Sequence, residues 1–552
     1  MRIEETHAPM DDIPPVCMSS WANTPFTWTL PDTFNFGIDV VDAWAQRTPT
    51  ATALIAVSRN GSERRLSFAE IAARSSRLAA GLLGAGLHRG DRVMLLLPRV
   101  PQWHVAMVAC FKAGLVPVPC VSMLTSADIA YRLHHGEIKG VIAHQSLVAK
   151  FASIDAPLTC CVSVGGGAPP DWHVYEDLVE REVSFRPESI ARDDPSIFYF
   201  TSGSTGDPKG VVHAARSTLV RCWQPWRWLG LKPGDIVWPT TDMGWTKAAT
   251  SSLFGPWYHG ATTIVHESPN TDSVLEVIAE YGVTCLCVSA TELRRLVART
   301  RPAVFPRSLR LTISAGEAVT ADLFEKWHAF SGTPLVAGYG QTETPMVMAT
   351  PPDHPGMAET MGIPFPGNDI ALVDENGCPV RTGCPGVIAV RRDNPGLMLG
   401  YWSVDGLNDG GTIRGEWYLT NDRAVCGPDG LFRFLGRADD VINASGYRIG
   451  PTEVENALLR HPAVRECAVV PSPDAERGEV VKAYIILNEA YVPSPELKSM
   501  LQQHVKSCIA PYKYPRRIEF VSEMPKNVSG KILRRVLKDR EFGSGHTPEA
   551  EP

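Results

Sequence analysis

Short, continuously apolar segments alternate with amphipathic helical segments up to about Gly362, and this alternation constrains the fold more than any other feature. The run RVMLLLP at residues 92–98 is typical of a strand buried on both faces. Ser67 and Glu70 form a capping-box signature that begins a predicted helix, and QWHVAMVACFKAG at 102–114 predicts the next helix. The segments GVIAH, GATTIVHE and VTCLCVSA continue the pattern. We therefore expect an α/β fold with a largely parallel, helix-covered sheet.

The composition of the sequence changes after Gly362, and this change sets the expected domain boundaries. From there to Phe434 the chain is rich in glycine, proline and turn pairs such as Asn376-Gly377, which is typical of a β-rich region. Mixed α/β segments return beyond Arg437 for about 115 residues, enough for a small domain. We expect an N-terminal extension (1–33), a large domain of two α/β subdomains plus a β-rich subdomain (34–436), a smaller α+β domain (437–540) and a disordered tail (541–552).

Composition narrows the class of protein. Of the 552 residues, 44% are hydrophobic and 20% are charged, as in soluble globular proteins. The 53 basic and 60 acidic side chains give a net charge of −7, so nothing points to nucleic acid as a partner. No run of eighteen apolar residues occurs, so we expect no membrane span.

The N-terminus and the cysteines favour a cytoplasmic protein. The segment MRIEETHAPMDDIPP has no apolar core of a secretory signal and is not rich in arginine as transit peptides are. Thirteen cysteines show no C-x-x-C pair and no zinc-ligand spacing. A disulfide or zinc framework is the alternative, but reduced and mostly buried thiols fit this pattern better.

The stretch YFTSGSTGDPKGVVH at 199–213 combines the features of a phosphate-binding loop. A predicted strand, SIFYF, leads into glycines that let backbone N–H groups approach an anion, while hydroxyls and Lys209 add donors and positive charge. A Walker A loop requires Gly-Lys followed by Ser or Thr, whereas Lys209 lies between Pro208 and Gly210. A flexible surface loop is the alternative. The stretch indicates phosphate binding, but not by a P-loop NTPase.

This loop resembles the phosphate loop of the adenylate-forming superfamily, which includes acyl-CoA synthetases, luciferases and the adenylation domains of peptide synthetases. Further segments agree in order and spacing: SAGEAV (314–319), GYGQTET (338–344), YLTNDRA (418–424), GRADDVINASGYRIGPTEVE (436–455) and PKNVSGKILR (525–534). From Phe34 to Arg535 the chain is most similar to medium-chain acyl-CoA synthetases.

The resemblance implies a site for ATP and Mg²⁺. Tyr339 would lie against adenine, Thr342 would contact the α-phosphate, and Glu343 would hold the metal. Asp422 would accept the ribose hydroxyls with Arg437 behind it, although its motif reads TND where TGD is usual. The remaining nucleotide contacts that the resemblance implies are Thr201, Ser202, Gly203, Ser204, Thr205, Gly206, Lys209, Gly316, Glu317, Gly338, Gly340 and Gln341.

The resemblance also implies a catalytic lysine and a mobile small domain. Lys531, acting with Thr342 and Glu343, would stabilise charge on the reacting carboxylate and α-phosphate; a solvated lysine in a basic tail is the alternative. The small domain would rotate about a hinge at Asp439 after adenylation, which would withdraw Lys531 and present the CoA-binding segment. The implied CoA contacts are Ser445, Gly446, Tyr447, Arg448, Arg477 and Arg516.

Two further features bear on CoA. Lys513 and Arg517 flank Arg516 in a basic group that could meet the 3′-phosphate of CoA or could be an ordinary solvated face. Ser122 stands where similar proteins carry a glutamine that touches CoA.

The acyl pocket implied by the resemblance consists of Trp245, Thr246, Lys247, Ala315 and Gly340. Acetate-specific members carry tryptophan at the position of Gly340, so glycine predicts room for a medium-chain, branched or aryl acid. Lys247 is expected to point toward phosphate or solvent; the alternative is that it selects an acid with a polar distal group.

The sequence thus predicts a ligase, a monomer or homodimer, that joins a small-molecule carboxylic acid to CoA through an acyl-adenylate and releases AMP and pyrophosphate. One alternative is a free-standing adenylation enzyme that loads a carrier protein, and another is a nucleotide-binding pseudoenzyme. The joint presence of Lys531, Glu343 and Asp422 argues against the pseudoenzyme.

Overall fold

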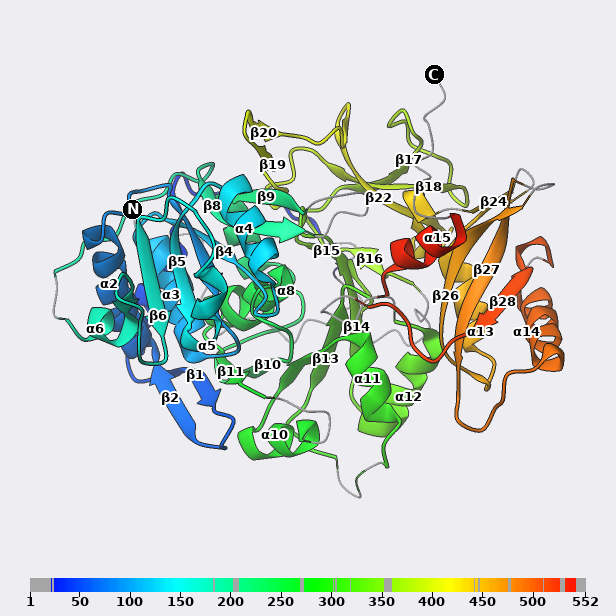
Figure 1. The fold of residues 1–552 in the computed structure, drawn as a ribbon, viewed down its shortest axis with the longest axis horizontal. Helices are drawn as coiled ribbons and strands as arrows, with labels where there is room; N and C mark the ends of the chain where they lie inside the picture. Colours follow the sequence, from blue (N-terminus) through cyan, green and yellow to red (C-terminus); the bar gives the residue numbers. More distant parts are fainter. Residues whose placement is uncertain are drawn as a thin grey trace.

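The structure is a computed structural model that describes residues 21, 24–181, 184–201, 208–268, 273–300, 302, 305–317, 319–351, 360–440, 442–444, 447–474, 478–509, 511–526 and 532–542. A large domain, blue to yellow in Figure 1, is followed by a smaller orange and red domain at one end. This is the division into a large α/β domain and a small C-terminal domain that the sequence predicts.

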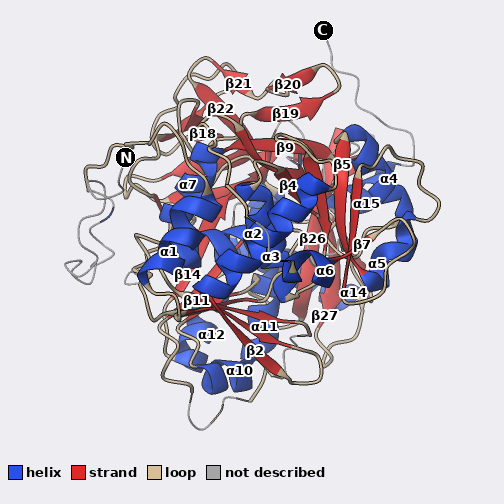
Figure 2. Cartoon of the chain, turned by 90° about the vertical axis from the view of Figure 1, so that its left-hand side faces the viewer, coloured by secondary structure: helices blue, strands red, loops and turns tan. Residues whose placement is uncertain are grey.

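The first α/β unit is a parallel five-stranded sheet. Its order is β4 (Val116–Pro119), β3 (Arg92–Leu96), β5 (Ile138–His144), β6 (Cys160–Val164) and β7 (His173–Val174). The expected capping box is present, since the Ser67 hydroxyl and the Glu70 backbone and carboxylate hydrogen bond reciprocally. Figure 2 shows two of the helices, α2 and α3, packed side by side. The helices of this unit are α2 (Phe68–Gly84), α3 (Pro101–Lys112), α4 (Ser126–His135), α5 (Gln145–Val148), η4 (Ala149–Phe151) and α6 (Tyr175–Glu180).

The second unit is a nine-stranded sheet whose central strands are parallel. Its order is β16 (Ile363–Pro364), β15 (Met346–Ala349), β14 (Leu335–Gly340), β13 (Leu311–Ala315), β12 (Cys285–Cys287), β10 (Ile236–Pro239), β11 (Thr262–His266), β1 (Thr52–Val57) and β2 (Glu63–Ser67). β2, β15 and β16 run antiparallel to their neighbours. The predicted site segments SAGEAV and GYGQTET therefore begin at the carboxyl ends of β13 and β14, where ligands of α/β sheets commonly bind.

Helices pack against this second sheet and close the unit. The helices are η3 (Gly37–Asp42), α1 (Ala43–Arg47), α7 (Ala215–Trp223), α8 (Thr246–Ala249), η5 (Thr250–Phe254), α9 (Gly255–Tyr258), α10 (Val274–Tyr281), α11 (Ala290–Val297) and α12 (Ala321–Ser331). Buried apolar side chains of α10, α11 and α12, such as Ile278, Leu293 and Trp327, share one core cluster with the sheet.

Two antiparallel sheets lie next to the α/β units. One has the order β20 (Gly406–Asn408), β19 (Gly400–Ser403), β9 (Lys209–Ala214) and β8 (Pro195–Thr201). The other contains β17 (Ile370–Val373), β18 (Pro385–Arg391), β22 (Trp417–Cys426) and β21 (Ile413–Arg414), with β23 (Phe432–Arg437) paired to β22. The strands β17 to β23 form the β-rich region predicted after Gly362, whereas β8 and β9 come from earlier in the chain.

The small domain is a sheet with helices. Its strands are β25 (Tyr447–Ile449), β24 (Ile442–Ala444), β27 (Gly478–Leu487), β26 (Val464–Asp474) and β28 (Arg517–Phe520). Its helices are η7 (Ala438–Asp440), α13 (Pro451–Leu459), α14 (Pro495–Cys508), η8 (Pro511–Lys513) and α15 (Arg534–Phe542), the last packed on β26 (Figure 1). The tail boundary expected at 541 was two residues early, because α15 includes Glu541 and Phe542.

Two compositional expectations can be compared with the structure. The twelve cysteines of the described residues are free thiols, and seven of them are buried, as the sequence predicts. Within the described ranges, no helix is both long and apolar enough to cross a bilayer.

Candidate active site

The phosphate-loop stretch is the tip of the hairpin formed by β8 and β9. The backbone of Thr201 pairs with that of Lys209 across this hairpin, so the two ends of the loop are held together. Gly210 lies directly against the Phe198 ring, where an added Cβ would lie 2.3 Å from Cζ. Ser202, Gly203, Ser204, Thr205 and Gly206 lie outside the described residues.

Lys209 and Glu343 approach the same tyrosine. The Tyr401 hydroxyl donates to Oε1 of Glu343 at 2.9 Å, and Nζ of Lys209 lies 5.2 Å from the centroid of the Tyr401 ring. Burial and the neighbouring Glu343 carboxylate raise the pKa of Tyr401, so the phenol remains a donor at neutral pH. β19, which contains Tyr401, pairs with β9 and thereby brings the phosphate hairpin to the GYGQTET turn.

Asp422 is the centre of a second cluster. Its Oδ2 accepts hydrogen bonds from the Tyr339 hydroxyl at 2.8 Å and from Nε2 of Gln341 at 2.7 Å, and Arg437 lies 3.9 Å from Oδ1. The Gln341 amide also donates to the Thr420 carbonyl at 2.8 Å. Because Asp422 is only 7% exposed, these donors offset the cost of burying its charge. Four predicted nucleotide residues from three segments therefore meet in one network.

The departure from the usual TGD motif has a conformational explanation. Asn421 has a φ of +61°, in the left-handed region that glycine adopts freely. Asparagine is among the few other residues that tolerate this region. The TND sequence thus accommodates the left-handed backbone conformation that precedes Asp422 within β22.

A buried arginine that the sequence analysis missed supports the turn at Thr342 and Glu343. Nη2 of Arg221, on α7, donates to the carbonyls of Thr342 and Thr344 at 3.1 and 2.9 Å. Its side chain is 1% exposed, and burial lowers its pKa to about 10, so it remains charged at neutral pH. The sequence signal that could have identified Arg221 is its position four residues after Ser217, on the helical face that the structure shows to be largely buried.

His213 contributes to the same support. Its Nε2 donates to the Thr342 carbonyl at 2.7 Å, and its Nδ1 lies 3.1 Å from the Ser217 hydroxyl. Burial and the adjacent Arg221 charge lower the pKa of His213 well below its usual value, so the imidazole is neutral. The backbone of the predicted α-phosphate contact is consequently fixed by buried donors.

Glu317 and Gly316 lie at the end of β13. The Glu317 carboxylate accepts from the backbone N–H and the hydroxyl of Thr291 at 3.1 and 3.0 Å, which ties SAGEAV to α11. Gly316 has a φ of +89°. Gly338 packs against Met346, whose Sδ would be 2.4 Å from an added Cβ.

Two expectations about the acyl pocket need correction. Lys247 does not simply reach solvent: it is partly buried, and its Nζ donates to the carbonyls of Val288 and Ala315 at 3.1 and 3.4 Å. Gly340 does not leave open space on its Cβ side, because an added Cβ would lie 2.3 Å from the Pro345 carbonyl oxygen. Trp245 precedes α8 and Thr246 is its first residue, both partly buried.

The predicted basic group in the small domain is partly neutralised. Lys513 pairs with Glu453, and Arg517 bonds to Ser472, the Pro473 carbonyl and Asp474. Arg516 is exposed, and its Nη1 donates to the Tyr514 hydroxyl at 2.9 Å. Arg516 is therefore the most available cation of the three.

Other predicted residues are described only in part. Lys531, Ser445, Gly446 and Arg477 lie outside the described residues. Tyr447 and Arg448 belong to β25, and Asp439 lies within η7. The Ser122 hydroxyl donates to Asp242 at 3.3 Å.

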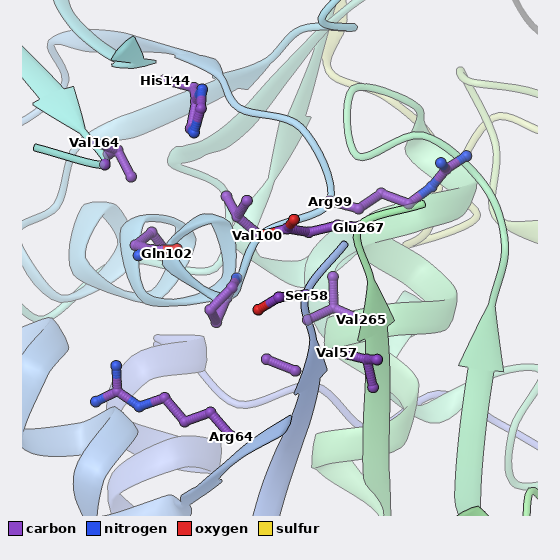
Figure 3. A pocket seen from close by; sticks show the side chains of 13 residues that line it. Val57, Ser58, Arg64, Arg99, Val100, Gln102, His144, Val164, Val265 and Glu267 are labelled. Carbon is purple, nitrogen blue, oxygen red and sulfur yellow. The ribbon is translucent and has the colours of Figure 1, made fainter. Parts of the chain in front are cut away.

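A cavity of about 250 Å³ lies apart from these clusters, where β1 and β11 approach the ends of β5 and β6 (Figure 3). Ser58, Gln102, His144 and Glu267 contribute polar lining. Arg99 is turned away, because its guanidinium donates to the carbonyls of Thr240 and Thr241 at 2.8 and 3.2 Å. None of the predicted site residues belongs to this lining.

Glu343 fits a metal that arrives with a nucleotide. Within the part of the chain that the structure describes, no three His, Cys, Asp or Glu side chains gather as metal ligands. Mg²⁺ is commonly held by one or two carboxylates together with substrate phosphates. A single carboxylate beside the phosphate hairpin has this character.

Known proteins resemble the chain over most of its length. Residues 41–402 match the family AMP-binding enzyme, and residues 453–531 match AMP-binding enzyme C-terminal domain. The acyl-coenzyme A synthetase ACSM5, mitochondrial, of Homo sapiens is 41% identical over 93% of this chain and 92% of its own length. The human acyl-coenzyme A synthetase ACSM3, mitochondrial, is 38% identical over 94% and 91%.

Solved structures agree with this relationship. The anthranilate CoA ligase AuaEII in complex with anthranoyl-AMP has a TM-score of 0.83 at 28% identity, covering 93% of this chain and 98% of its own. A benzoate CoA ligase from Burkholderia xenovorans has a TM-score of 0.80 at 28% identity, covering 92% and 100%.

The relatives overturn one expectation and establish another. The human relatives are named as mitochondrial proteins and point to the mitochondrion, so the expected cytoplasmic location was wrong. The expected superfamily is confirmed: with a family match over more than half of its residues, the chain belongs to the AMP-binding enzymes.

Proposed function

We propose that this enzyme joins a carboxylic acid to coenzyme A in two half-reactions. The substrate carboxylate attacks the α-phosphorus of ATP, which forms acyl-AMP and releases pyrophosphate. The CoA thiol then attacks the acyl carbonyl carbon, which forms the thioester and releases AMP. The observation that carries the proposal is the meeting of the phosphate hairpin, the Glu343 turn and the Asp422 network. It is supported by similarity to an acyl-coenzyme A synthetase over 93% of the chain.

The nucleotide would lie along these clusters. Lys209 and the loop before it would hold the β- and γ-phosphates, and Thr342 would contact the α-phosphate. The Asp422 carboxylate, whose Oδ2 accepts from Tyr339 and Gln341, would also accept the ribose hydroxyls. The Tyr339 ring would lie against adenine.

Glu343 would hold Mg²⁺ together with the phosphates. The ion would reduce the repulsion between the attacking carboxylate and the α-phosphate. The hydrogen bond from Tyr401 orients the Glu343 side chain for this role.

Lys531 would serve the first half-reaction and the CoA segment would serve the second. The ammonium of Lys531 would stabilise negative charge at the carboxylate and α-phosphate. Rotation of the small domain about Asp439 would then bring Ser445 to Arg448 toward the thioester site, with Arg516 available for the 3′-phosphate of CoA.

The acid is larger than acetate: medium-chain, branched or aryl. Thr246 and Ala315 are small, and the related CoA ligases of known structure include ones for anthranilate and benzoate. Lys247, whose Nζ donates to the Ala315 carbonyl, would give the pocket a positively charged group. Burying each additional methylene contributes about 0.8 kcal/mol, so affinity should rise with acid size until the pocket is filled.

A product assay tests the proposal. The enzyme is incubated with ATP, Mg²⁺, CoA and a panel of acids from acetate to C8 and benzoate, and AMP and acyl-CoA are quantified by chromatography. We expect equal amounts of AMP and acyl-CoA, with kcat/KM rising from acetate to the larger acids. AMP formation without acyl-CoA would contradict the CoA assignment, and a preference for acetate would contradict the pocket assignment.

A further inference from the structure

The chain on either side of Lys531 is tied together at one point. Lys526 and Ile532 form an antiparallel bridge, and the Leu533 N–H donates to the Pro525 carbonyl at 2.8 Å. Residues 527–531 lie outside the described residues, and the chain that flanks them on either side is paired at these positions. We call these paired positions, 525–526 and 532–533, the base of the segment. Contacts that fix the base limit how far Lys531 can reach.

Arg534 anchors the returning side of the base. Its Nη2 and Nε donate to Oε2 and Oε1 of Glu455 at 2.5 and 3.2 Å, a two-point contact between α15 and α13. Glu455 is only 7% exposed, and its Oε1 also accepts the Val469 N–H of β26 at 2.8 Å. Glu455 thus joins three elements of the domain: α13, β26 and α15.

Separate contacts hold the outgoing side of the base and the far end of α15. Nζ of Lys526 lies 2.7 Å from the Glu466 carboxylate on β26. At the other end of the helix, the Glu541 carboxylate accepts from Ser472, Lys482 and Tyr484. The helix after Lys531 is consequently fixed at both ends.

The contacts of Arg534 suit a residue that holds the chain in place rather than one that directs its charge at a substrate. Glu455 pairs with it directly, and the Asp440 carboxylate of the hinge segment also acts on it electrostatically. With two acidic neighbours inside its own domain, its charge is locally compensated. A direct role on phosphate would require breaking this partly buried pair and leaving the Glu455 carboxylate without its cation.

We propose that Glu455 and Arg534 are positioning residues for adenylation, because their ion pair fixes the base of the segment that carries Lys531. The inference rests on the proposed role of Lys531. It predicts that loosening the pair impairs the first half-reaction and spares the second, because Lys531 serves only the first.

The test compares both half-reactions in Glu455→Gln, Arg534→Lys and Arg534→Ala. Adenylation is followed as pyrophosphate released with ATP and acid, and thioester formation is followed from supplied acyl-AMP and CoA. The matched control is Arg535→Ala, since Arg535 is the next residue and pairs only loosely, at 3.7 Å, with Asp539 on the exposed side of α15. Circular dichroism melting curves establish that each variant folds.

For Arg534→Ala we expect kcat of adenylation to fall by about 10²-fold, the scale of a small misplacement of a reacting group, with KM for ATP within about threefold. Arg534→Lys keeps the charge but loses the two-point contact, so it should recover only part of the rate. Glu455→Gln should resemble Arg534→Lys. Thioester formation should remain within about twofold of the wild type in these variants and in the Arg535→Ala control.

Two outcomes would overturn the proposal: loss of both half-reactions to the same extent in folded Glu455→Gln and Arg534→Lys, or adenylation by all three variants at the rate of Arg535→Ala. Lys531→Ala is measured in parallel. If it adenylates normally, the assigned role of Lys531 fails, and this result is distinguishable from a failure of the ion pair alone.

Discussion

The turn that carries Thr342 and Glu343 is supported by the buried Arg221 and His213, whereas the residues that flank the segment of Lys531 are held by ion pairs nearer the surface. In the first case the donors reach backbone carbonyls across elements of the large domain. In the second, Arg534–Glu455 and Lys526–Glu466 join elements of the small domain to one another.

The difference matches what each region would do during catalysis. A nucleotide site that serves both half-reactions gains from buried, immobile donors, since pre-organised groups need no rearrangement when charge develops. Lys531, in contrast, is proposed to move together with the small domain, so the contacts that position it must lie within that domain. The predictions below test whether the two kinds of support divide between the half-reactions in this way.

Lys531→Ala should give the largest effect. We expect adenylation to fall by about 10²–10³-fold, the usual loss when one pre-organised donor is removed. Thioester formation from supplied acyl-AMP should be nearly unchanged. Single-turnover measurements of the two half-reactions check this, and an equal loss in both would remove the contrast between the two regions.

Asp439→Pro should produce the opposite pattern. Proline fixes φ at the proposed hinge and restricts Ala438 before it, while every residue of the Asp422 network keeps its identity. We expect acyl-CoA formation to fall by about 10²-fold while pyrophosphate exchange continues. If both activities decline together in a folded variant, the pivot lies elsewhere.

Arg221→Met tests the buried support and should affect both half-reactions. Methionine fills much of the volume but leaves the Thr344 carbonyl without its donor and the Thr342 carbonyl with His213 alone, at about 1–3 kcal/mol for each unsatisfied group. We expect the free energy of unfolding to drop by about 3 kcal/mol and kcat of adenylation to fall about tenfold.

Urea denaturation and initial rates measure these two losses. Arg216→Met is the control: it lies on the same helix but bonds to Asp193 and the Pro395 carbonyl instead of the turn. A stable, fully active Arg221→Met would show that the turn needs no buried charge.

Sequence patterns predicted elements whose cause is local. The capping box at Ser67, the buried strand at 92–96 and the β-rich region after Gly362 each follow from neighbouring residues. The nucleotide residues could be chosen through the resemblance, but their contacts could not. The bond from Tyr401 to Glu343 and the bonds from Arg221 to the turn join residues more than fifty positions apart, which no local pattern encodes.

The corrections have the same origin. Gly340 looked like an opening because it lacks a side chain, yet the backbone of Pro345 fills that direction once β14 and β15 pair. Lys247 was expected to point toward phosphate or solvent because its charge is visible in the sequence while its carbonyl acceptors are not. The surroundings of both residues depend on which segments pack against them in the folded chain, and residue type alone does not reveal this.

Lys247→Met should change substrate preference rather than overall rate. Removing the ammonium gives the pocket more apolar surface, roughly the equivalent of one methylene, or about 0.8 kcal/mol. We expect kcat/KM for a linear C6 acid to rise about fourfold relative to a C6 acid with a distal hydroxyl. Competition between the two acids in one reaction measures the ratio. An unchanged ratio would remove Lys247 from the acyl pocket and leave it a structural residue.

Asn421→Ala should give the smallest effect, and it tests why the ribose motif tolerates its departure from glycine. Asn421 has a φ of +61°, where alanine is disfavoured by about 1 kcal/mol relative to glycine or asparagine. We expect Asn421→Ala to lose about 1 kcal/mol of unfolding free energy and Asn421→Gly to lose less than about 0.5 kcal/mol, both measured by urea denaturation. Because Asp422 follows directly, KM for ATP should rise slightly in the alanine variant and stay constant in the glycine variant. If alanine is as stable as asparagine, the backbone at 421 is not constrained, and the tolerance of TND must come from the Tyr339 and Gln341 bonds to Asp422 alone.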